Sequence, residues 1–355
     1  AYTAIDDPEA YFQTEIYTGN GSDDRTITLS ADTDMQPDLV WVKNRGQADN
    51  HHAFDSVRGA NQALSPSTTA VESDTPSSGT VSAFSSDGFT VTSGSSSDDN
   101  VNKNTETYVA WCWKAGGSAS SNSDGSLTTS VSANTTAGFS IVSYTLGSGS
   151  GSSTQGHGLG AVPHLILHRS RVNAYNWSVY HHTKSAAPET DRLIINSDGA
   201  TVDVQQAWND TAPTSTLFSH GDNSWNGAGT AISYVFSEKQ GFSKFGSYTG
   251  NGNADGPFIY TGFRPAFVMI KRTDAAGWWN IIDNKRLGYN ALNPRLYPNV
   301  NNVEDATEAV MDILSNGFKA RATSQYINYS AGTYVYMAFA EAPFVNSEGV
   351  PCNAR

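Results

Sequence analysis

The sequence has little cysteine and little charge, and it lacks a long hydrophobic run. Cys112 and Cys352 are the only cysteines among 355 residues, and the repeats described below place them in different units. We therefore expect no disulfide framework, and the redox compartment stays undetermined. No apolar run is long enough to cross a bilayer, so we expect no membrane-inserted segment.

Positive charge is scarce and is not clustered. The chain carries 21 Lys and Arg against 34 Asp and Glu, a formal net charge of −13 at pH 7. Without a basic patch, neither nucleic acid nor an anionic membrane is an expected partner. Gly, Ser, Thr and Asn are abundant, and only 15% of the residues are charged. This composition is typical of extracellular or virion β proteins.

The sequence also lacks an initiator methionine and a signal peptide. It begins with AYTAIDDPEAYF, which indicates a fragment, a processed product or the ordered part of something longer. We therefore interpret residues 1–10 as an N-terminal lead that continues from an upstream part.

An internal repeat organises the chain. YTGNG occurs at 17–21 and at 248–252, and SYTLGSG at 143–149 is a weaker copy. Each copy is followed by four further runs in the same order. The first of these runs starts with Pro and the last with Thr, at nearly constant intervals of 70, 67 and 68 positions: Pro37 to Thr107, Pro163 to Thr230 and Pro265 to Thr333.

These matches predict three copies of one unit of about 100 residues. The predicted units span 11–114, 138–240 and 241–355. A Ser/Gly/Thr-rich segment at 115–137 is predicted to be a linker. It is either flexible, with a root-mean-square span on the order of 25–30 Å, or extended along a domain surface. The next joint, 239–246, is too short for free motion, so the second and third units should pack as a rigid pair.

Strand signals dominate each unit. The closing run TYVYMAF at 333–339 carries apolar or aromatic side chains on both faces, which predicts a central strand buried on both sides. Asn-Gly in YTGNG is a strong local signal for a hairpin. Short strands at regular spacing predict an all-β chain of three tandem antiparallel β-sandwiches. Jelly-roll or concanavalin-like topology fits the pattern, and other sandwich topologies stay open.

One segment of the third unit carries a helix pattern. Residues 301–318 have acidic residues early, then apolar Val310, Ile313 and Leu314 spaced for one face, then Asn-Gly as a stop. We predict a short helix here, with an irregular loop as the alternative.

Catalytic and metal-binding patterns are weak. No G-x-S-x-G elbow occurs, and the adjacent histidines at 51–52 and 181–182 would point to opposite faces of a strand. NGNADG at 251–256 resembles the start of a calcium loop, but position 262 is Gly instead of the closing glutamate. A hairpin tip is therefore the preferred interpretation. We expect no enzyme activity, no cofactor and no metal.

The aromatic residues divide into repeated and unrepeated ones. Trp177 and Trp279 occupy matching positions, with Phe54 as their counterpart in the first unit, and are expected in the core. Four further aromatic residues are candidates for surface contact with a ligand: Tyr175, Trp208, Trp225 and Trp278. Loop aromatics on a β-sandwich commonly bind sugar rings or protein surfaces. The alternative is that each folds back onto its own domain.

Several runs resemble a known group of proteins. YTGNGNADGPFIYTGFRPAFVMIKRTD, TAPTSTLFSHGDNS, LSNGFK and GTYVYMAFAEAPF are similar to an uncharacterised tandem β repeat in tail-fibre or other virion proteins of marine and aquatic tailed bacteriophages. DPEAYFQTEIYTGNG and DTDMQPDLVWVKNR are similar to earlier copies of that repeat. The resemblance covers nearly the whole chain, most closely the third unit, and it offers no catalytic motif.

This resemblance implies a non-enzymatic virion protein, extracellular when mature, that serves as a tail-fibre or spike component in host-surface recognition. Tandem sandwiches would make a rigid rod whose sheet edges are protected. The implied partners are other virion proteins, further copies in a homo-oligomer (a trimer by likeness to phage fibres) and a host-surface glycan or protein. A purely structural role in capsid decoration or the tail is the first alternative, and a glycan depolymerase is the second.

Overall fold

The computed structural model describes residues 2–74, 76–95, 100–148, 151–222, 226–286, 290 and 293–352. Each of the three repeats folds into a larger and a smaller antiparallel sheet packed as a sandwich, which confirms the all-β prediction. The sheets form because β-branched and aromatic residues fill the short strands, whereas Gly, Asn, Asp and Ser fill the turns.

The first and third units have the same topology. The elements of the first are η1 (Pro8–Ala10), β1 (Phe12–Thr18), β2 (Arg25–Thr28), β3 (Leu39–Asn44), β4 (His52–Asp55), η2 (Pro76–Ser78), β5 (Thr80–Ser85), β6 (Gly88–Thr92) and β7 (Thr107–Trp113). Those of the third are β18 (Ser243–Thr249), β19 (Phe258–Tyr260), β20 (Phe263–Arg272), β21 (Asn280–Asp283), β22 (Met311–Leu314), β23 (Gly317–Ala320) and β24 (Thr333–Pro343). The larger sheets have the orders β1-β7-β3-β4 and β18-β24-β20-β21, and the smaller sheets have the orders β2-β6-β5 and β19-β23-β22.

The second unit departs from this plan. Its elements are β8 (Ser120–Asn122), β9 (Thr129–Asn134), β10 (Phe139–Leu146), β11 (Ser153–Gly156), β12 (Leu165–Ser170), β13 (Ser178–His181), β14 (Asp191–Ile194), β15 (Val202–Asp203), α1 (Gln205–Trp208), β16 (Leu217–His220) and β17 (Gly229–Phe236). The larger sheet grows to eight strands, β15-β14-β13-β12-β17-β10-β9-β8, while the smaller sheet keeps only β11 and β16.

Residues 115–137 do not form a flexible linker; of the two expected forms, the extended one is present. Two strands, β8 and β9, form within this segment; β9 pairs with β10, and β8 pairs with β9 as the edge strand of the eight-stranded sheet. The segment can pair because Thr129 and Val131 are buried while Ser130 between them is exposed, the alternation of a half-buried strand.

The predicted helix at 301–318 is also absent. The segment is extended: Asp305 forms an antiparallel bridge with Arg295, and β22 follows. Met311 and Ile313 are buried in β22 while Asp312 between them is half-exposed, so a period of two prevails over the helical spacing. In the described part of the chain, the single α-helix is α1 in the second unit.

The Asn-Gly turns are not hairpins, because β1 and β2, like β18 and β19, lie in different sheets. A buried asparagine holds each turn. In the third unit Asn328 Nδ2 donates to Asn251 Oδ1 at 3.0 Å and to the Asn253 carbonyl at 2.7 Å. A Cβ at Gly250 would lie 2.2 Å from the Tyr329 carbonyl oxygen, and Gly252 has φ +65°. Both glycines are therefore needed.

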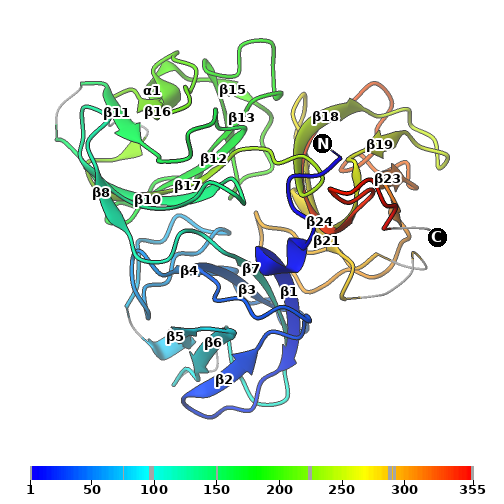
Figure 1. The fold of residues 1–355 in the computed structure, drawn as a ribbon, viewed down its shortest axis with the longest axis horizontal. Coiled ribbons are helices and arrows are strands. Elements are labelled where there is room, and N and C mark those ends of the chain that lie inside the picture. The colour runs from blue at the N-terminus through cyan, green and yellow to red at the C-terminus, as the bar shows by residue number, and fades with distance from the viewer. Residues whose placement is uncertain are drawn as a thin grey trace.

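The three larger sheets face one another around a common axis, so the body is three-lobed and not the expected rod (Figure 1). Each larger sheet consequently has two buried faces. In β7, Tyr108 and Ala110 face the core of the first unit, whereas Val109 and Trp111 face a core that all three units share. The prediction that the closing run at 333–339 is buried on both sides is confirmed, and the second face is explained by the neighbouring units.

Equivalent aromatic residues of the three closing strands meet in the shared core. Trp113 lies 6.5 Å from Phe236 and 5.8 Å from Phe339, measured between ring centroids, and Phe236 lies 5.9 Å from Phe339. Phe12 stacks on Phe339 at 5.1 Å. Each pair adds roughly 0.5–1.5 kcal/mol to the burial of its surface.

The units are joined head to tail, and one backbone hydrogen bond recurs at all three joints. The Glu72 N–H donates to the Arg171 carbonyl at 2.8 Å. In the same way the Thr201 N–H donates to the Thr273 carbonyl at 2.9 Å, and the Glu304 N–H donates to the Arg45 carbonyl at 2.9 Å. They connect the first unit to the second, the second to the third, and the third back to the first. The ring is therefore closed.

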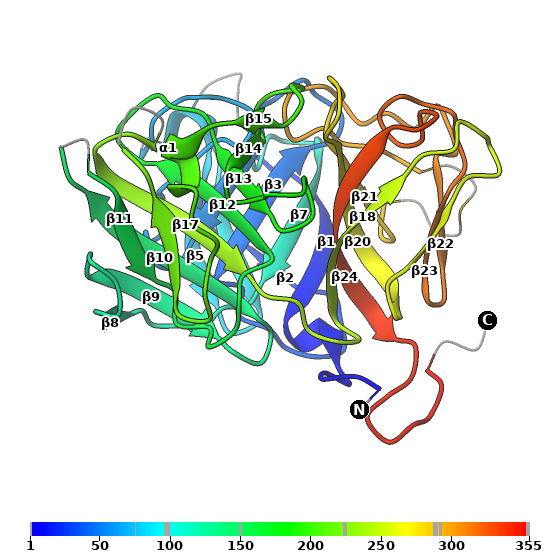
Figure 2. The same ribbon diagram turned by 90° about the horizontal axis from the view of Figure 1, so that it is seen from above.

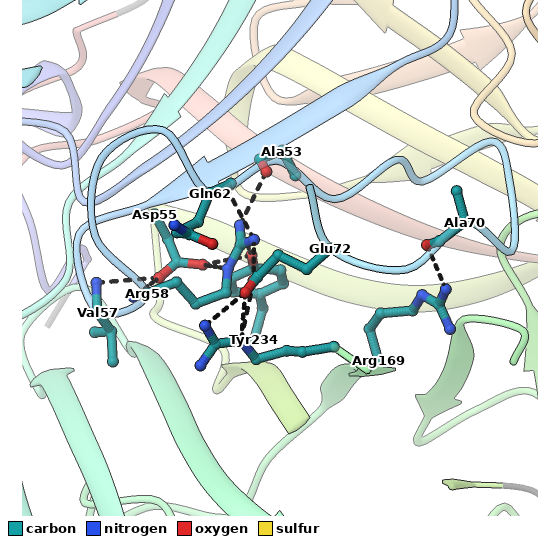
Figure 3. Close-up of polar contacts among 10 residues, drawn as sticks. Ala53, Asp55, Val57, Arg58, Gln62, Ala70, Glu72, Arg169 and Tyr234 are labelled. Atoms are coloured by element: carbon teal, nitrogen blue, oxygen red, sulfur yellow. Dashed lines mark hydrogen bonds and ion pairs between the residues drawn. The ribbon is translucent and has the colours of Figure 1, made fainter. Parts of the chain in front are cut away.

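A buried polar cluster reinforces the joint between the first and second units (Figure 3). Arg58 pairs with Asp55, and both side chains are fully buried. Glu72 accepts from Arg58 at 2.9 Å and from Arg171 of the second unit at 2.6 Å. The Tyr234 hydroxyl, also of the second unit, donates to Asp55 Oδ2 at 2.7 Å. Every charge in the cluster thus has an opposite partner.

The joint between the third and first units has the same construction. Arg286 pairs with Asp283 at 2.7 Å, Glu304 bridges Arg286 and Arg45, and Trp111 Nε1 donates to Asp283 Oδ2 at 3.0 Å. At the remaining joint His181 takes the place of the aspartate, by its pairing with Leu165 in β12. Its Nε2 donates to the Tyr336 carbonyl at 3.0 Å.

Strand register corrects one sequence match. In the pairing of β3 with β4, Asp55 is opposite Leu39, as Asp283 is opposite Phe267 in the third unit. Counting back from these aspartates, the counterpart of Trp279 is His51 and not Phe54. Phe54 instead faces the core that the two sheets of the first unit enclose.

The inner core of the second unit contains a polar cluster. The Tyr144 hydroxyl lies 2.9 Å from His168 Nδ1, 2.7 Å from His220 Nε2 and 2.7 Å from Ser233 Oγ. Burial lowers the pKa of His168 well below its usual range and that of His220 to about 4. Both rings are therefore neutral in the folded chain near pH 7.

We expect Arg58→Met to lower the free energy of unfolding by about 3–5 kcal/mol, because it leaves Asp55 buried without its cation. Urea denaturation followed by tryptophan fluorescence measures the loss. Arg321→Met is the matched control, since Arg321 forms only exposed ion pairs and should cost less than about 1 kcal/mol. Equal losses for the two variants would show that the cluster does not hold the joint.

Acid should destabilise the chain below pH 6.5. The unfolded chain protonates its histidines near that pH, whereas the folded chain excludes the proton from His220 until about pH 4. The contribution of each buried neutral histidine to the free energy of unfolding is therefore fully present above pH 6.5. It falls toward pH 4 by about 1.4 kcal/mol per pH unit. Denaturation midpoints measured from pH 8 to pH 4.5 test this, and the double variant His168→Ile, His220→Val should show a shallower decline. An unchanged slope in that variant would refute the assignment.

Candidate functional site: aromatic residues at the loop end

The chain termini lie at one end of the body, and one set of loops lies at the opposite end (Figure 2). Strands β3, β12 and β20 all end on the side of these loops. The Asn-Gly turns held by Asn102 and Asn328 follow β1 and β18 on the same side. We call this side the loop end. The N-terminal segment lies at the other end, where Ser347 donates its backbone N–H to Asp6 Oδ1 at 2.7 Å.

The four candidate aromatic residues do not form one site. Tyr175 is 36% exposed in a loop of the second unit, and Trp278 is half-buried in a loop of the third. Trp208 is only 1% exposed, so its prediction as a surface residue is wrong. It belongs to α1 and packs inside the second unit, 5.8 Å from Tyr180 and 5.4 Å from His220 between ring centroids. Trp225 lies outside the described residues.

Trp278 belongs to a larger set, which we call the aromatic platform: Arg272, Trp278, Tyr297, Tyr326 and Tyr329. Trp278 stacks on Tyr326 with ring centroids 5.5 Å apart and planes 5° apart, and Tyr297 meets it edge-on at 5.0 Å. The Arg272 guanidinium lies 4.6 Å from the Tyr329 ring centroid. Tyr329 is 51% exposed, so the platform reaches the surface.

One ion pair, between Arg272 and Asp274, fixes the charge of the platform. Arg272 makes two bonds to Asp274, at 3.0 and 2.9 Å, and Asp274 also accepts the Thr333 N–H at 3.0 Å. The hydrogen bond from Arg272 lowers the pKa of Asp274 to about 2, and the same bond raises the pKa of Arg272. The guanidinium therefore stays charged and oriented against Tyr329 at neutral pH.

The shared fold does not require this platform. In the first unit the strand register and the buried asparagine place Asn44, Asn50, Asn100 and Lys103 at the positions of Arg272, Trp278, Tyr326 and Tyr329. The sequence pattern did not single out Tyr326 or Tyr329, although both lie in a polar segment just before a closing strand. Comparing each loop with its repeat counterparts would have found them.

A second surface is lined by hydroxyl groups. A shallow cleft of about 390 Å³ lies over β8, β9, β10 and β17. Its Ser and Thr side chains are Ser121, Thr128, Thr129, Ser130, Ser143, Thr145 and Thr230. No acidic or basic side chain lines it, so it suits a neutral ligand that forms hydrogen bonds.

The serine and histidine cluster of the second unit does not offer a reactive site. Tyr144, His168, His220 and Ser233 are at most 4% exposed. In the described part of the chain, no group of three or more His, Cys, Asp or Glu residues is placed to hold a metal ion. Within the same residues, no helix is long and apolar enough to cross a membrane.

Comparison with known proteins yields a family but no described function. No curated protein and no solved structure matches the chain. One family model, a domain of unknown function (DUF7483), matches residues 7–343. The match spans all three sandwich units, so a single model covers the whole closed ring. The chain belongs to this DUF7483 family.

Proposed function

We propose that this chain is a non-enzymatic virion protein of a tailed bacteriophage, a fibre or spike component whose loop end adheres to the host surface. The observation that carries the adhesive role is the aromatic platform, which the shared fold does not require. The assignment to a virion rests on the sequence resemblance described above.

The platform suits a carbohydrate ligand. The half-buried Trp278 offers an apolar ring that can stack against the C–H face of a sugar, and the exposed Tyr329 offers a hydroxyl group on the same unit. Aromatic rings combined with a few fixed polar groups are the usual composition of such sites. Stacking by Tyr326 and Tyr297 holds the tryptophan in place before the ligand arrives, which reduces the entropy lost on binding.

The closed ring holds the aromatic platform in a fixed position for binding a ligand. Loops are mobile when little holds them, but a backbone hydrogen bond joins every unit to each neighbour, and an ion pair adds to two of the three joints. Both ends of the chain leave the body on the side away from the platform (Figure 2). A ligand could therefore approach the loop end without meeting the terminal segments.

Trp278→Ala should weaken binding by about 30-fold, since truncating a central aromatic anchor costs about 2 kcal/mol. Binding of the full chain to immobilised bacterial surface polysaccharides and to whole host cells measures the effect. Tyr2→Ala is the matched control, because Tyr2 is 63% exposed but lies in the N-terminal segment. A urea denaturation curve shows whether each variant is folded.

Three other results would contradict the proposal. Equal adsorption of Trp278→Ala and the unchanged chain would exclude the platform from adhesion. Absence of any glycan or cell binding, together with binding to purified capsid or tail proteins, would favour the purely structural alternative. Release of reducing sugar from a host polysaccharide would favour a depolymerase.

A further inference from the structure

The second unit shows how the outer edge of a smaller sheet can be covered. Leu127, which lies between β8 and β9, forms a parallel bridge with Gln155 of β11, and its N–H donates to the Thr154 carbonyl at 3.1 Å. Thr129 Oγ1 donates to the Gly156 carbonyl at 2.9 Å. Residues 126–129 therefore run along β11 and bond the carbonyl groups that point away from β16.

The third unit has the same edge without this cover. Gln155 in β11 is opposite Phe218, and Ile259 in β19 is opposite Phe318. Both phenylalanines occupy one position of the repeat, so Phe258 and Tyr260 correspond to Thr154 and Gly156. In the described part of the chain, β19 is the last strand of its sheet.

The backbone of β19 points outward at two residues. The Pro257 carbonyl accepts from Ala320 N–H at 3.1 Å, and Thr261 N–H donates to the Asn316 carbonyl at 3.0 Å. Alternate residues of an antiparallel edge strand face opposite ways. Ile259 therefore shares its backbone groups with β23, and those of Phe258 and Tyr260 face away from the sheet.

The outward side chains of β19 are aromatic, unlike those at the equivalent edge of the first unit. Phe258 is 48% exposed and Tyr260 is 58% exposed. At the same positions of the first unit, β2 carries Thr26 and Thr28, by the pairing of Ile27 with Phe89. Two aromatic side chains on a free strand edge favour association with another strand, and natural sheets usually avoid this combination.

We infer that the free edge of β19 is a docking site for an extended segment of a partner polypeptide, which adds to the smaller sheet as a parallel strand. The covering segment in the second unit defines the chemistry of that partner. It is Ser-Leu-Thr-Thr, which is uncharged and combines hydroxyl groups with one aliphatic side chain. Main-chain bonds supply the affinity of such added strands, and flanking side chains supply the specificity.

The partner segment comes from another chain. The second unit takes its covering strand from the long segment at 115–137, but only residues 237–242 separate β17 from β18. That joint is also used locally, since Lys239 pairs with Ser243. It has no residues left to run along β19.

Nuclear magnetic resonance of the isotopically labelled full chain tests the docking site. The probe is a synthetic peptide with the sequence of residues 122–131, NSDGSLTTSV. We expect the amide signals of Phe258 and Tyr260 to shift saturably at about millimolar peptide, the effective concentration of a tethered segment. Hydrogen exchange at these two amides should slow at least tenfold.

Two variants make the test specific. Tyr260→Pro removes an outward N–H without touching the bonds to β23, and it should abolish the shifts. Tyr260→Phe keeps the backbone and the ring, and it should bind as the unchanged chain does. If Tyr260→Pro does not fold, Tyr260→Lys places a charge on the edge and should weaken the response at least tenfold.

Three outcomes would overturn the inference. The first is no change at either amide up to about 5 mM peptide, well above the effective concentration of a tethered segment. The second is a response confined to Thr26 and Thr28 on the equivalent edge of the first unit. The third is protection of Phe258 and Tyr260 that grows with protein concentration in the absence of peptide, because a second copy would then occupy the edge.

Discussion

Burial of the second face of each larger sheet is the constraint on which the rest of the structure depends. Trp111 and Trp113 in β7 point away from the core of their own unit and into a core shared by all three. A unit taken alone would expose these rings to water, at a cost of roughly 25 cal/mol for each Å² of apolar surface. The three units therefore fold as one body. The family model, which covers residues 7–343 as a single domain, has the extent expected of such a body.

The buried ion pairs follow from that constraint and select its register. A buried Asp–Arg pair contributes little net stability, because desolvation offsets the attraction, but removing one partner is costly. Asp55 and Asp283 therefore require the neighbouring unit to present Tyr234 and Trp111 as hydrogen-bond donors. At the remaining joint His181 replaces the aspartate, and Met337 lies where the donor ring would be. Two joints therefore share one construction and the third differs from them, so the surfaces at the joints are not all interchangeable.

Local signals predicted the local part of this fold. The strand runs and the apolar character of both faces of TYVYMAF can be recognised from residues close together in sequence, and the structure confirms them. Closure of the ring depends on pairs such as Arg45 and Glu304, 259 positions apart, for which the sequence contains no nearby signal. The helix pattern at 301–318 and the hairpin signal of YTGNG were overridden by tertiary pairing. Tyr326 and Tyr329 became recognisable as site residues only once the register showed that their counterparts in the first unit are polar.

One structural element connects the two proposed contact surfaces. Asn328 holds the turn that leads from β18 to β19, and Tyr329 of the aromatic platform is the next residue. A Cβ at Gly250 in that turn would collide with the Tyr329 carbonyl, so the turn lies in close contact with the backbone of Tyr329. The interaction that positions Tyr329 for a ligand therefore also sets where β19 begins. Because Tyr329 lies just before β24 whereas β19 follows the turn, the two proposed surfaces lie on different elements of the third unit, and neither proposal excludes the other.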